Sequence, residues 1–215
     1  MTVKSSAILV YETLLDRYGD LHWWPAQTPY EVMVGAVLTQ NTAWSNVEKA
    51  IANFGGNLSP EVVEKASLAE LAETIRPAGY FNQKAVYLKA VTEWYSGYGF
   101  DPASVRKGPF PKLRAELLAV KGVGKETADS ILLYAFAFPT FVADAYTVRL
   151  CERYPLSAGK GYDSVKAYFE ANLPHDERIY NNFHALIVIN GKEYCRKKPL
   201  CRGCPLAGIC GRVGL

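Results

Sequence analysis

Apolar residues recur at intervals of three and four along most of this chain. Between Val3 and Tyr18, for example, apolar side chains stand at positions 7, 8, 10, 11, 14 and 15. This spacing places them on one face of an amphipathic helix. No segment shows the strict alternation of apolar and polar residues that is typical of a half-buried strand. The pattern therefore predicts an all-α chain, with no internal repeat and no low-complexity region.

Three further helix starts carry local signatures. Thr28-Pro29-Tyr30-Glu31 combines an N-cap, a proline at the first helical position and a glutamate three residues after the cap. Ser59-Pro60-Glu61 is a second start, and Ser67-Leu68-Ala69-Glu70 has the pattern of a capping box. Other predicted helices are 29 to 38, 43 to 54, one that begins near Asn82 after a turn at Gly79, 127 to 138, 145 to 154, 163 to 172 and 176 to 190. Glycines and prolines punctuate residues 97 to 111, which we expect to form a long loop.

A glycine pair lies between two of the predicted helices. Gly122-Val123-Gly124 follows an apolar segment, and a helical pattern resumes at Thr127. The glycines permit a sharp turn and expose backbone N–H groups at the start of the second helix, where donors and the helix dipole favour a phosphate. Lys121 and Lys125 add positive charge on both sides. The hairpin is thus a candidate contact for a nucleic-acid backbone, and an ordinary helix–helix turn is the alternative.

One carboxylate stands just beyond this hairpin. The second helix ends at Phe138-Pro139, and the apolar run from Thr140 to Ala143 places Asp144 directly ahead of another helix. An aspartate at such a position can cap the helix, and this carboxylate stands just beyond a candidate phosphate-binding hairpin.

Composition limits the classes of protein to which the chain can belong. With 215 residues, of which 49% are hydrophobic, it can bury a large core in one domain or in two lobes. The net charge of +3 does not indicate a uniformly basic surface, so a local basic face must carry any DNA binding. No run of 18 apolar residues and no signal-peptide pattern occur. We therefore expect a cytoplasmic protein without a membrane partner.

Four of the five cysteines stand near the C-terminus, at Cys195, Cys201, Cys204 and Cys210. In a reducing compartment four close thiols favour metal ligation over disulfides, and unligated thiols would be prone to oxidation. Four thiolates suit tetrahedral zinc or an iron–sulfur cluster. Zinc ribbons usually place their ligands in two close pairs, whereas only the central two cysteines are close here. The wider spacing between the outer cysteines and the central pair fits a group larger than one zinc ion. Cys151 is most simply a core residue.

These features together resemble the endonuclease III, or helix-hairpin-helix-GPD, superfamily of DNA glycosylases. The resemblance rests on Val120 to Gly124, on the helix from Thr127 and on Phe141 to Tyr146, and it extends from about Tyr30 to the C-terminus. It implies a two-lobed helical fold with a DNA cleft between the lobes. The implied middle lobe is 29–136, and the second lobe is 1–28 plus 137–215, ending in the cluster loop 195–210. It also implies that Asp144 is the catalytic aspartate.

Two positions depart from the family pattern. Bifunctional members carry a lysine nucleophile two residues after the second hairpin glycine, where this chain has Glu126. A carboxylate cannot form a Schiff base, so we expect a monofunctional glycosylase without AP-lyase activity unless Lys125 takes that role. The family's 4Fe-4S loop has six, two and five intervening residues, and here the first gap is one residue shorter. The resemblance favours a 4Fe-4S cluster and leaves zinc as the alternative.

A second resemblance, to one branch of this superfamily, concerns the pocket for the damaged base. His22-Trp23-Trp24-Pro25 and the run from Gly35 to Trp44 resemble the 3-methyladenine DNA glycosylases of the endonuclease III class. By this resemblance Trp23, Trp24, Pro25 and Trp44 line a base pocket, with Lys192 near it; ordinary packing of the tryptophans and a solvated lysine are the alternatives. An electron-rich ring attracts a cationic base by about 0.5–2 kcal/mol, which would select a methylated purine over adenine.

Three polar residues have open assignments. Gln40 and Asn41 stand where the family inserts a polar side chain into the gap left by a flipped base, and capping the next helix is their alternative role. We expect His184 to be a core histidine.

The function that we expect is base excision. An alkylated purine is positively charged and leaves easily, so the enzyme has to stabilise an oxocarbenium-like sugar and to position water, and Asp144 can do both. The expected partner is duplex DNA with a damaged base, bound by a monomer close to the nucleoid. The alternatives are a monofunctional glycosylase for uracil or thymine mismatches or for oxidised bases, and a non-catalytic iron–sulfur protein that binds DNA.

Overall fold

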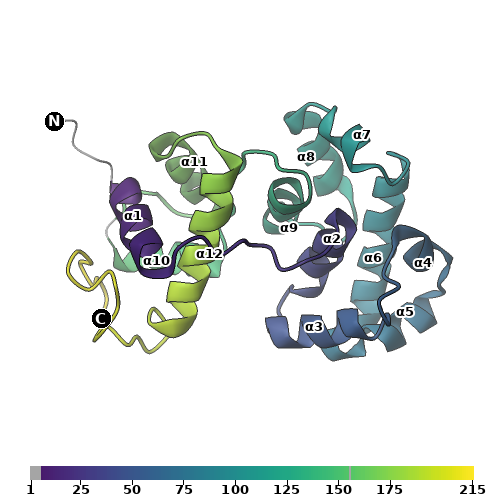
Figure 1. Cartoon of the computed structure of the whole chain (residues 1–215), viewed down its shortest axis with the longest axis horizontal. Helices are drawn as coiled ribbons and strands as arrows, with labels where there is room; N and C mark the ends of the chain where they lie inside the picture. Colours follow the sequence, from purple (N-terminus) through teal and green to yellow (C-terminus); the bar gives the residue numbers. More distant parts are fainter. Residues whose placement is uncertain (1–5, 155) are drawn as a thin grey trace. The chain divides into compact units, whose positions relative to one another are not determined.

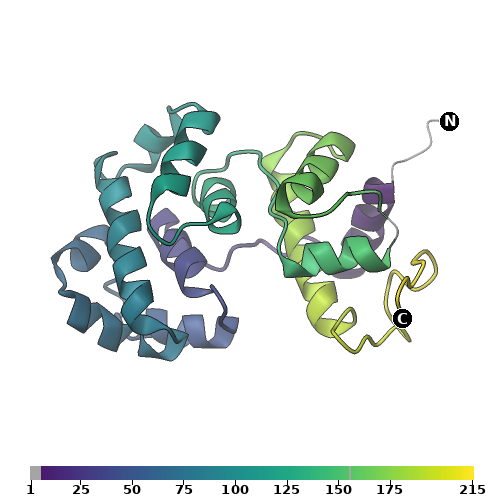
Figure 2. The same ribbon diagram turned by 180° about the vertical axis from the view of Figure 1, so that it is seen from behind.

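The computed structural model describes residues 6–154 and 156–215, and the chain is helical in these ranges, with no strand. The all-α prediction is therefore confirmed. The predicted start of the first helix at Val3 lies outside the described residues. The chain divides into two compact units, shown from opposite sides in Figures 1 and 2. Unit 1 consists of the described residues within Met1–Trp24 and Pro139–Leu215, and unit 2 is Pro25–Phe138. The assignment of two functional lobes stays a prediction.

Unit 2 is built around a short helix that is apolar on nearly every side. This helix, α2 (Pro29–Leu38), buries every residue from Val32 to Leu38, and it packs against α6, α9 and η2 (Figure 1). A helix that is hydrophobic all round belongs in the middle of a core. The other elements of unit 2 are α3 (Trp44–Ala52), α4 (Pro60–Lys65), α5 (Leu68–Thr74), the 3-10 turn η1 (Arg76–Ala78), α6 (Phe81–Ser96), α7 (Pro102–Arg106), α8 (Phe110–Ala119), α9 (Lys125–Ser130) and the π-helical η2 (Ile131–Ala135).

The three helix starts with local signatures form as predicted. The Thr28 side chain accepts a hydrogen bond from the Glu31 N–H at 3.1 Å at the start of α2. Ser59 caps α4 in the same way, with its hydroxyl 3.3 Å from the Val62 nitrogen. Ser67 forms the complete capping box at α5. In each case the side chain satisfies an N–H group that the helix itself leaves without a partner.

Two predictions in unit 2 are wrong. Residues 97 to 111 do not form one long loop, because they contain α7 and the start of α8. Asp101 caps α7, and Pro102 and Pro111 stand in first turns, where a proline fits since the missing N–H would have no helical acceptor. Asn82 does not cap α6 either. That helix begins one residue earlier, after Tyr80 in a left-handed conformation with φ of 46°, and has no side-chain cap.

Unit 1 is arranged around its last helix. Its helices are α1 (Ser6–Tyr18), α10 (Ala145–Arg153), α11 (Tyr162–Asn172) and α12 (Glu177–Glu193), close to the ranges predicted for them. Helix α12 packs against α1 and α10, and its Phe183 meets a cluster of aromatic rings. In this cluster the rings of Phe141 and Phe169 stack with centroids 4.4 Å apart. The segment that leads to Asp144 is thus anchored in the core of unit 1 at Phe141.

The first and the last helix of unit 1 are joined by specific contacts. The Tyr18 hydroxyl donates to Glu193 at 2.9 Å, and the Leu21 N–H donates to Asn182 Oδ1 at 3.0 Å. The ring of Tyr11 packs on that of Phe183, with centroids 5.1 Å apart. Among the described residues, no helix has the length and apolar character that crossing a membrane requires.

Candidate functional site

Asp144 is the N-cap of α10. Its Oδ1 accepts hydrogen bonds from the Thr147 N–H at 2.8 Å and from the Thr147 hydroxyl at 3.0 Å. The side chain is 13% exposed. The capping role that the sequence allowed is therefore present, and the capping geometry leaves Oδ2 without a bond to Thr147. The catalytic role of Asp144 stays a prediction at this point.

A histidine from another helix meets the second carboxylate oxygen. His184 on α12 places Nε2 3.5 Å from Asp144 Oδ2, and its side chain is 7% exposed. Burial by itself raises the pKa of Asp144, but the attraction of His184 and the hydrogen bonds from Thr147 outweigh burial, so that this pKa lies below its ordinary value of 3.8. The carboxylate is thus ionised at neutral pH. His184 is buried, as expected of a core residue, but its contact with Asp144 was missed from the sequence.

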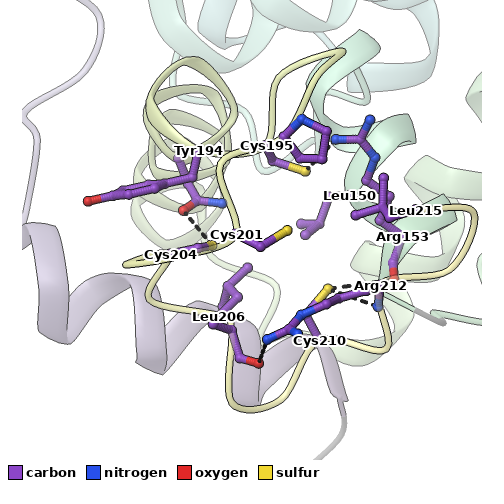
Figure 3. A pocket seen from close by; sticks show the side chains of 13 residues that line it. Leu150, Arg153, Tyr194, Cys195, Cys201, Cys204, Leu206, Cys210, Arg212 and Leu215 are labelled. Carbon is purple, nitrogen blue, oxygen red and sulfur yellow. Dashed lines mark hydrogen bonds between the residues drawn. The ribbon is translucent and has the colours of Figure 1, made fainter.

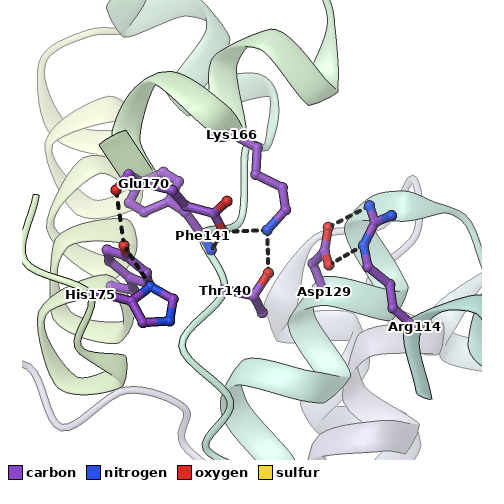
Figure 4. Close-up of polar contacts among 8 residues, drawn as sticks. Arg114, Asp129, Thr140, Phe141, Lys166, Glu170 and His175 are labelled. Atoms are coloured by element: carbon purple, nitrogen blue, oxygen red, sulfur yellow. Dashed lines mark hydrogen bonds and ion pairs between the residues drawn. The ribbon is translucent and has the colours of Figure 1, made fainter. Parts of the chain in front are cut away.

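The backbone ahead of Asp144 is held by a lysine and a glutamate of α11 (Figure 4). Glu170 accepts a hydrogen bond from the Phe141 N–H at 2.9 Å and also pairs with Lys166. The Lys166 ammonium donates to the Thr140 hydroxyl as well. Lys166 is almost fully buried, so a paired and hydrogen-bonded environment is what allows its charge there. This network fixes the main chain only three residues before the carboxylate.

The start of α10 also makes a close contact with α12. A Cβ atom added at Gly191 would lie 2.4 Å from Cδ1 of Tyr146, so only glycine leaves room for this ring. Arg149 covers the Tyr146 ring, with its guanidinium carbon 4.9 Å from the ring centroid. The first turn of α10, which carries Asp144, is therefore packed directly on the α12 backbone.

Three of the five residues predicted for a base pocket lie together in unit 1. The rings of Trp23 and Trp24 meet edge to face, with centroids 5.9 Å apart, and the Lys192 ammonium lies 6.0 Å from the Trp23 centroid. The indole N–H of Trp23 is buried and has no hydrogen-bond partner among the described residues. Pro25 and Trp44 belong to unit 2. A pocket formed by all five residues stays a prediction.

The hairpin of unit 2 connects α8 to α9 and packs on a tyrosine ring. Gly122 has a φ of +84°, and a Cβ atom there would lie 2.2 Å from the ring of Tyr87. Gly124 is the N-cap of α9 and has open space at its Cβ position. Lys121 and Lys125 are exposed on either side of the turn. The predicted helix-hairpin-helix is thus present, and its glycines have different tasks: Gly122 allows close packing, and Gly124 leaves the start of α9 open.

Gln40, which lies two residues after the end of α2, stabilises this hairpin by hydrogen bonds. Its Nε2 donates to the Gly122 carbonyl and to the Thr127 hydroxyl, both at 3.0 Å. Asn41 is exposed and has a φ of 53°. Neither residue caps the next helix, since the N-cap of α3 is Ala43 and no side chain caps it, so this alternative is wrong. The prediction that the pair contacts DNA stays open.

An open hollow lies at the start of α9. It is lined by Thr39, Gln40, Asn41, Gly122, Gly124, Glu126 and Thr127. Glu126 is exposed in the first turn of the helix, where a carboxylate interacts favourably with the helix dipole. The position at which bifunctional relatives of the predicted family carry a lysine is therefore accessible and acidic.

A buried ion pair joins the two helices of the hairpin (Figure 4). Arg114 on α8 donates from Nε to Asp129 Oδ1 at 2.8 Å and from Nη2 to Oδ2 at 3.0 Å. The Asp129 side chain is fully buried, and that of Arg114 is 21% exposed. A bidentate pair of this kind restricts both the distance and the angle between α8 and α9. The sequence does not reveal this pair, because charges fifteen residues apart show no short-range pattern.

All four C-terminal cysteines line one pocket in unit 1 (Figure 3). The Arg153 guanidinium donates to Cys195 Sγ at 3.3 Å, and the Arg212 N–H donates to Cys210 Sγ at 3.4 Å. No three His, Cys, Asp or Glu side chains in the described part of the chain converge on a point that suits one metal ion. Two of the four sulfurs accept hydrogen bonds, and the identity of a group held by these thiols stays a prediction.

Comparisons with known proteins agree with this architecture. Residues 34–175 match the model of the HhH-GPD superfamily base excision DNA repair proteins. A putative DNA repair glycosylase of Methanocaldococcus jannaschii is 51% identical over 94% of both chains, and endonuclease III of Escherichia coli is 26% identical over 85% of this chain and 83% of its own.

Among solved structures, an H. pylori 3-methyladenine DNA glycosylase bound to 1,N6-ethenoadenine is 28% identical. It has a TM-score of 0.74, with 88% of this chain and 98% of that chain covered. An endonuclease III–DNA complex has a TM-score of 0.80 at 22% identity, covering 98% and 96% of the two chains, and this likeness shows the shared fold.

Proposed function

The chain belongs to the HhH-GPD superfamily of base excision DNA repair proteins and is a DNA glycosylase that binds DNA, and we propose that it is a monofunctional enzyme that hydrolytically releases alkylated purines of the 3-methyladenine type from duplex DNA. The observation that carries this proposal is the Asp144 carboxylate. It is nearly buried, is fixed by hydrogen bonds at the start of α10 and has a lowered pKa.

An ionised, oriented carboxylate suits the chemistry of base release. An alkylated purine already carries positive charge, so its departure needs little protonation, and the main requirement is to stabilise the sugar as positive charge develops on it. In our proposal the Asp144 carboxylate stabilises this charge and orients the attacking water. Burial strengthens the interaction because little solvent screens it.

The residue at the hairpin supports our proposal of hydrolysis without strand cleavage. Lyase chemistry in this superfamily requires an amine that forms a Schiff base with the sugar, and Glu126 has none. Lys125, next to it, is exposed at the first position of α9. We propose that Lys125 contacts the DNA backbone together with Lys121, Gly122, Val123 and Gly124, and that water is the only nucleophile.

The aromatic residues of unit 1 support the assignment of the base. Trp23 and Trp24 present large rings close together, and a cationic base is attracted to such a ring. The H. pylori protein that is 28% identical to this chain is a 3-methyladenine DNA glycosylase. We propose that Trp23 and Trp24 bind the flipped base, with Pro25, Trp44 and Lys192 as further pocket residues, and that Gln40 and Asn41 contact the DNA beside the flipped nucleotide.

One observation favours a second candidate. The Lys192 ammonium lies 6.0 Å from the Trp23 ring, where its positive charge opposes the approach of a cationic base. A neutral damaged base, such as uracil, mismatched thymine or an oxidised purine, does not meet this repulsion. The second candidate is therefore a monofunctional glycosylase for neutral bases, built on the same Asp144 chemistry.

We also propose that Cys195, Cys201, Cys204 and Cys210 hold a 4Fe-4S cluster. When bound, such a cluster supplies a rigid four-point link for a loop that contains no helix. Arg153 reinforces the same loop, since it donates to the Arg196 carbonyl at 2.6 Å and to the Lys197 carbonyl at 3.1 Å. Purified holoprotein should contain about four iron and four sulfide per chain, and Cys204→Ser should lose both. If the protein instead contains one zinc per chain and no sulfide, the cluster assignment is wrong and the four cysteines bind zinc.

The decisive experiment measures free base released from duplex DNA in single turnover. Wild type and Asp144→Asn are given methylated duplex, with uracil-containing, thymine-mismatched and oxidised duplexes in parallel. Asp176→Asn is the matched control, because Asp176 caps α12 through hydrogen bonds from the N–H groups of Arg178 and Ile179 and has no proposed catalytic role. Both variants should fold, and only Asp144→Asn should lose base release.

Each outcome selects one reading. Release of 3-methyladenine that requires Asp144 supports the first candidate, and release of only neutral bases supports the second. If Asp144→Asn remains as active as wild type, the catalytic assignment is wrong and Asp144 is only a helix cap. Salt-sensitive binding of every duplex without any base release would mean a non-catalytic DNA-binding protein.

A further inference from the structure

The two oxygens of the Asp144 carboxylate have different surroundings. Oδ1 accepts both hydrogen bonds from Thr147, at 2.8 and 3.0 Å. Oδ2 faces His184 Nε2 at 3.5 Å, a longer contact from a different helix. Thr147 lies on the helix that Asp144 caps, so it fixes Oδ1 relative to α10 alone. Only His184 relates the carboxylate to α12.

Helix α12 contacts the first turn of α10 at two positions on one face. His184 and Gly191 are seven residues apart, which is two helical turns or about 10.5 Å along the axis. His184 meets Asp144, and Gly191 receives the Tyr146 ring, against which a Cβ atom would come within 2.4 Å. Contacts at two separated points fix the direction of α10 on α12 as well as its distance. The histidine is therefore placed by the same packing that places the carboxylate.

We propose that His184 is a positioning residue for the base-release reaction, which donates from Nε2 to Asp144 Oδ2 and thereby holds the carboxylate ionised and in one orientation. This inference rests on the proposed catalytic role of Asp144. The long contact to Oδ2 leaves lone pairs on that oxygen, whereas Oδ1 is occupied by Thr147. Oδ2 is thus the oxygen that interacts with the sugar or the water, and His184 sets its direction.

Other charged groups in this part of unit 1 have partners of their own. The groups that act on the Asp144 carboxyl are His184 from α12 and Thr147 from α10. On α11, Lys166 pairs with Glu170. On α10, Arg149 donates to the Cys195 carbonyl at 2.7 Å. Within the described chain, His184 is therefore the one titratable side chain that contributes to the lowered pKa of Asp144.

The test compares three replacements of His184. In His184→Gln the side-chain amide nitrogen can occupy the place of Nε2, whereas in His184→Asn the amide nitrogen stops near the place of Nδ1 and cannot reach Oδ2. His184→Leu removes the donor and fills the same space with an apolar side chain of similar size. His175→Gln is the matched control, since His175 is exposed in the same unit and does not contact Asp144. Methylated duplex DNA is the substrate, and uracil-containing duplex is used in parallel.

Two readouts are taken from each holoprotein. The first is the single-turnover rate of base release, measured together with the Kd for the duplex. We expect the rate to fall about 10- to 100-fold in His184→Leu and His184→Asn, the range for losing a hydrogen bond to an ionised group, while Kd stays within about twofold. His184→Gln should recover the rate to within about threefold of wild type. The second readout is the titration of the Asp144 carboxyl carbon by NMR, whose midpoint should rise in the Leu and Asn variants only.

The outcomes separate this inference from the proposed function. If His184→Leu keeps the wild-type rate while Asp144→Asn loses it, the catalytic assignment stands and the role of His184 is refuted. If Gln, Asn and Leu all lose activity equally, His184 only fills space, and the inference is again refuted. If wild type releases no base, the proposed function fails, and the NMR titration still decides whether His184 holds the carboxylate: an unchanged midpoint in His184→Leu overturns the inference.

Discussion

Replacing Arg114 with methionine should be more harmful than its partial exposure suggests. The variant would leave the Asp129 carboxylate fully buried beneath the hairpin without the two hydrogen bonds that Arg114 supplies at 2.8 and 3.0 Å. Removing one partner of a buried pair costs about 3–5 kcal/mol, chiefly because the remaining charge has lost its compensation. For Arg114→Met we expect about 3 kcal/mol, the lower end of that range, because Arg114 retains some exposure and water can enter where it stood.

Replacing Asp129, the other partner of the pair, should lower the free energy of unfolding by less. In Asp129→Asn the buried group becomes neutral and keeps its shape, and the Arg114 side chain, which is 21% exposed, can turn toward solvent. We expect a loss of about 1–2 kcal/mol. Arg76→Met is the surface control, since the Arg76–Glu73 pair has side chains 56% and 67% exposed and such pairs contribute about 0–1 kcal/mol. The order Arg114→Met, Asp129→Asn, Arg76→Met follows the burial of the charge that each variant leaves without its partner: Asp129 is fully buried, Arg114 is 21% exposed and Glu73 is 67% exposed.

Urea denaturation measures these differences. The midpoints give the free energies if the slope m is the same for all variants, and thermal unfolding should show a fall of roughly 6–12 °C for Arg114→Met. The double variant Arg114→Met/Asp129→Asn isolates the pairwise energy by a double-mutant cycle. If Arg114→Met costs less than 1 kcal/mol, or no more than Arg76→Met, our reading of the pair as the fixed link between α8 and α9 is refuted.

Three further changes test the hairpin and the carboxylate. Glu126→Lys places an amine at the exposed first turn of α9, so borohydride should trap this variant on abasic DNA but not wild type; equal trapping of both would assign lyase chemistry to another residue. Gly122→Ala should weaken duplex binding and lower the free energy of unfolding by about 1–3 kcal/mol, because the new Cβ would overlap the Tyr87 ring and alanine is strained at a φ of +84°. Gly124→Ala is the matched control: the space at its Cβ position is open, so the free energy of unfolding should stay within about 1 kcal/mol of wild type. Since the folded-state pKa of Asp144 is lowered from 3.8, its contribution to stability is complete above that pH and is lost as the pH falls through the lowered value. The difference in unfolding temperature between wild type and Asp144→Asn should therefore narrow as the pH falls below 3.8, and a difference that widens instead would contradict the assigned cause.

Local signals predicted most helices of this chain because each depends on neighbouring residues. The capping box at Ser67 and the Thr28-Pro29 start satisfy backbone N–H groups within one turn, and both form as predicted. The same local reasoning failed between residues 97 and 111. There the glycines and prolines favour a loop by local rules, although a proline in the first turn begins a helix as readily as it interrupts one.

Contacts between distant residues explain what the sequence did not reveal about the site. His184 was expected to be in the core, and it is, but its contact with Asp144 joins residues forty positions apart. Gln40 donates hydrogen bonds to Gly122 and Thr127, more than eighty positions away along the chain, which no local pattern predicts. Hydrophobic periodicity shows which face of a helix is buried, but it does not show which polar group from another helix meets that face. Such pairs become visible only in the folded chain.

The order in which the ribosome produces the helices constrains how this protein matures. Unit 2 is one continuous segment, so its core can close as soon as residue 138 is available. Helix α1 ends at Tyr18, and its partner α12 begins at Glu177, about 160 residues later. At synthesis rates of about 5–20 residues per second, α1 waits roughly 8–30 seconds for that partner. During this interval Ala7, Val10 and Leu14, which the finished fold buries, have no α12 to cover them. The nascent N-terminal helix is therefore a candidate client for a chaperone, and unit 1 is completed only when nearly the whole chain has been made.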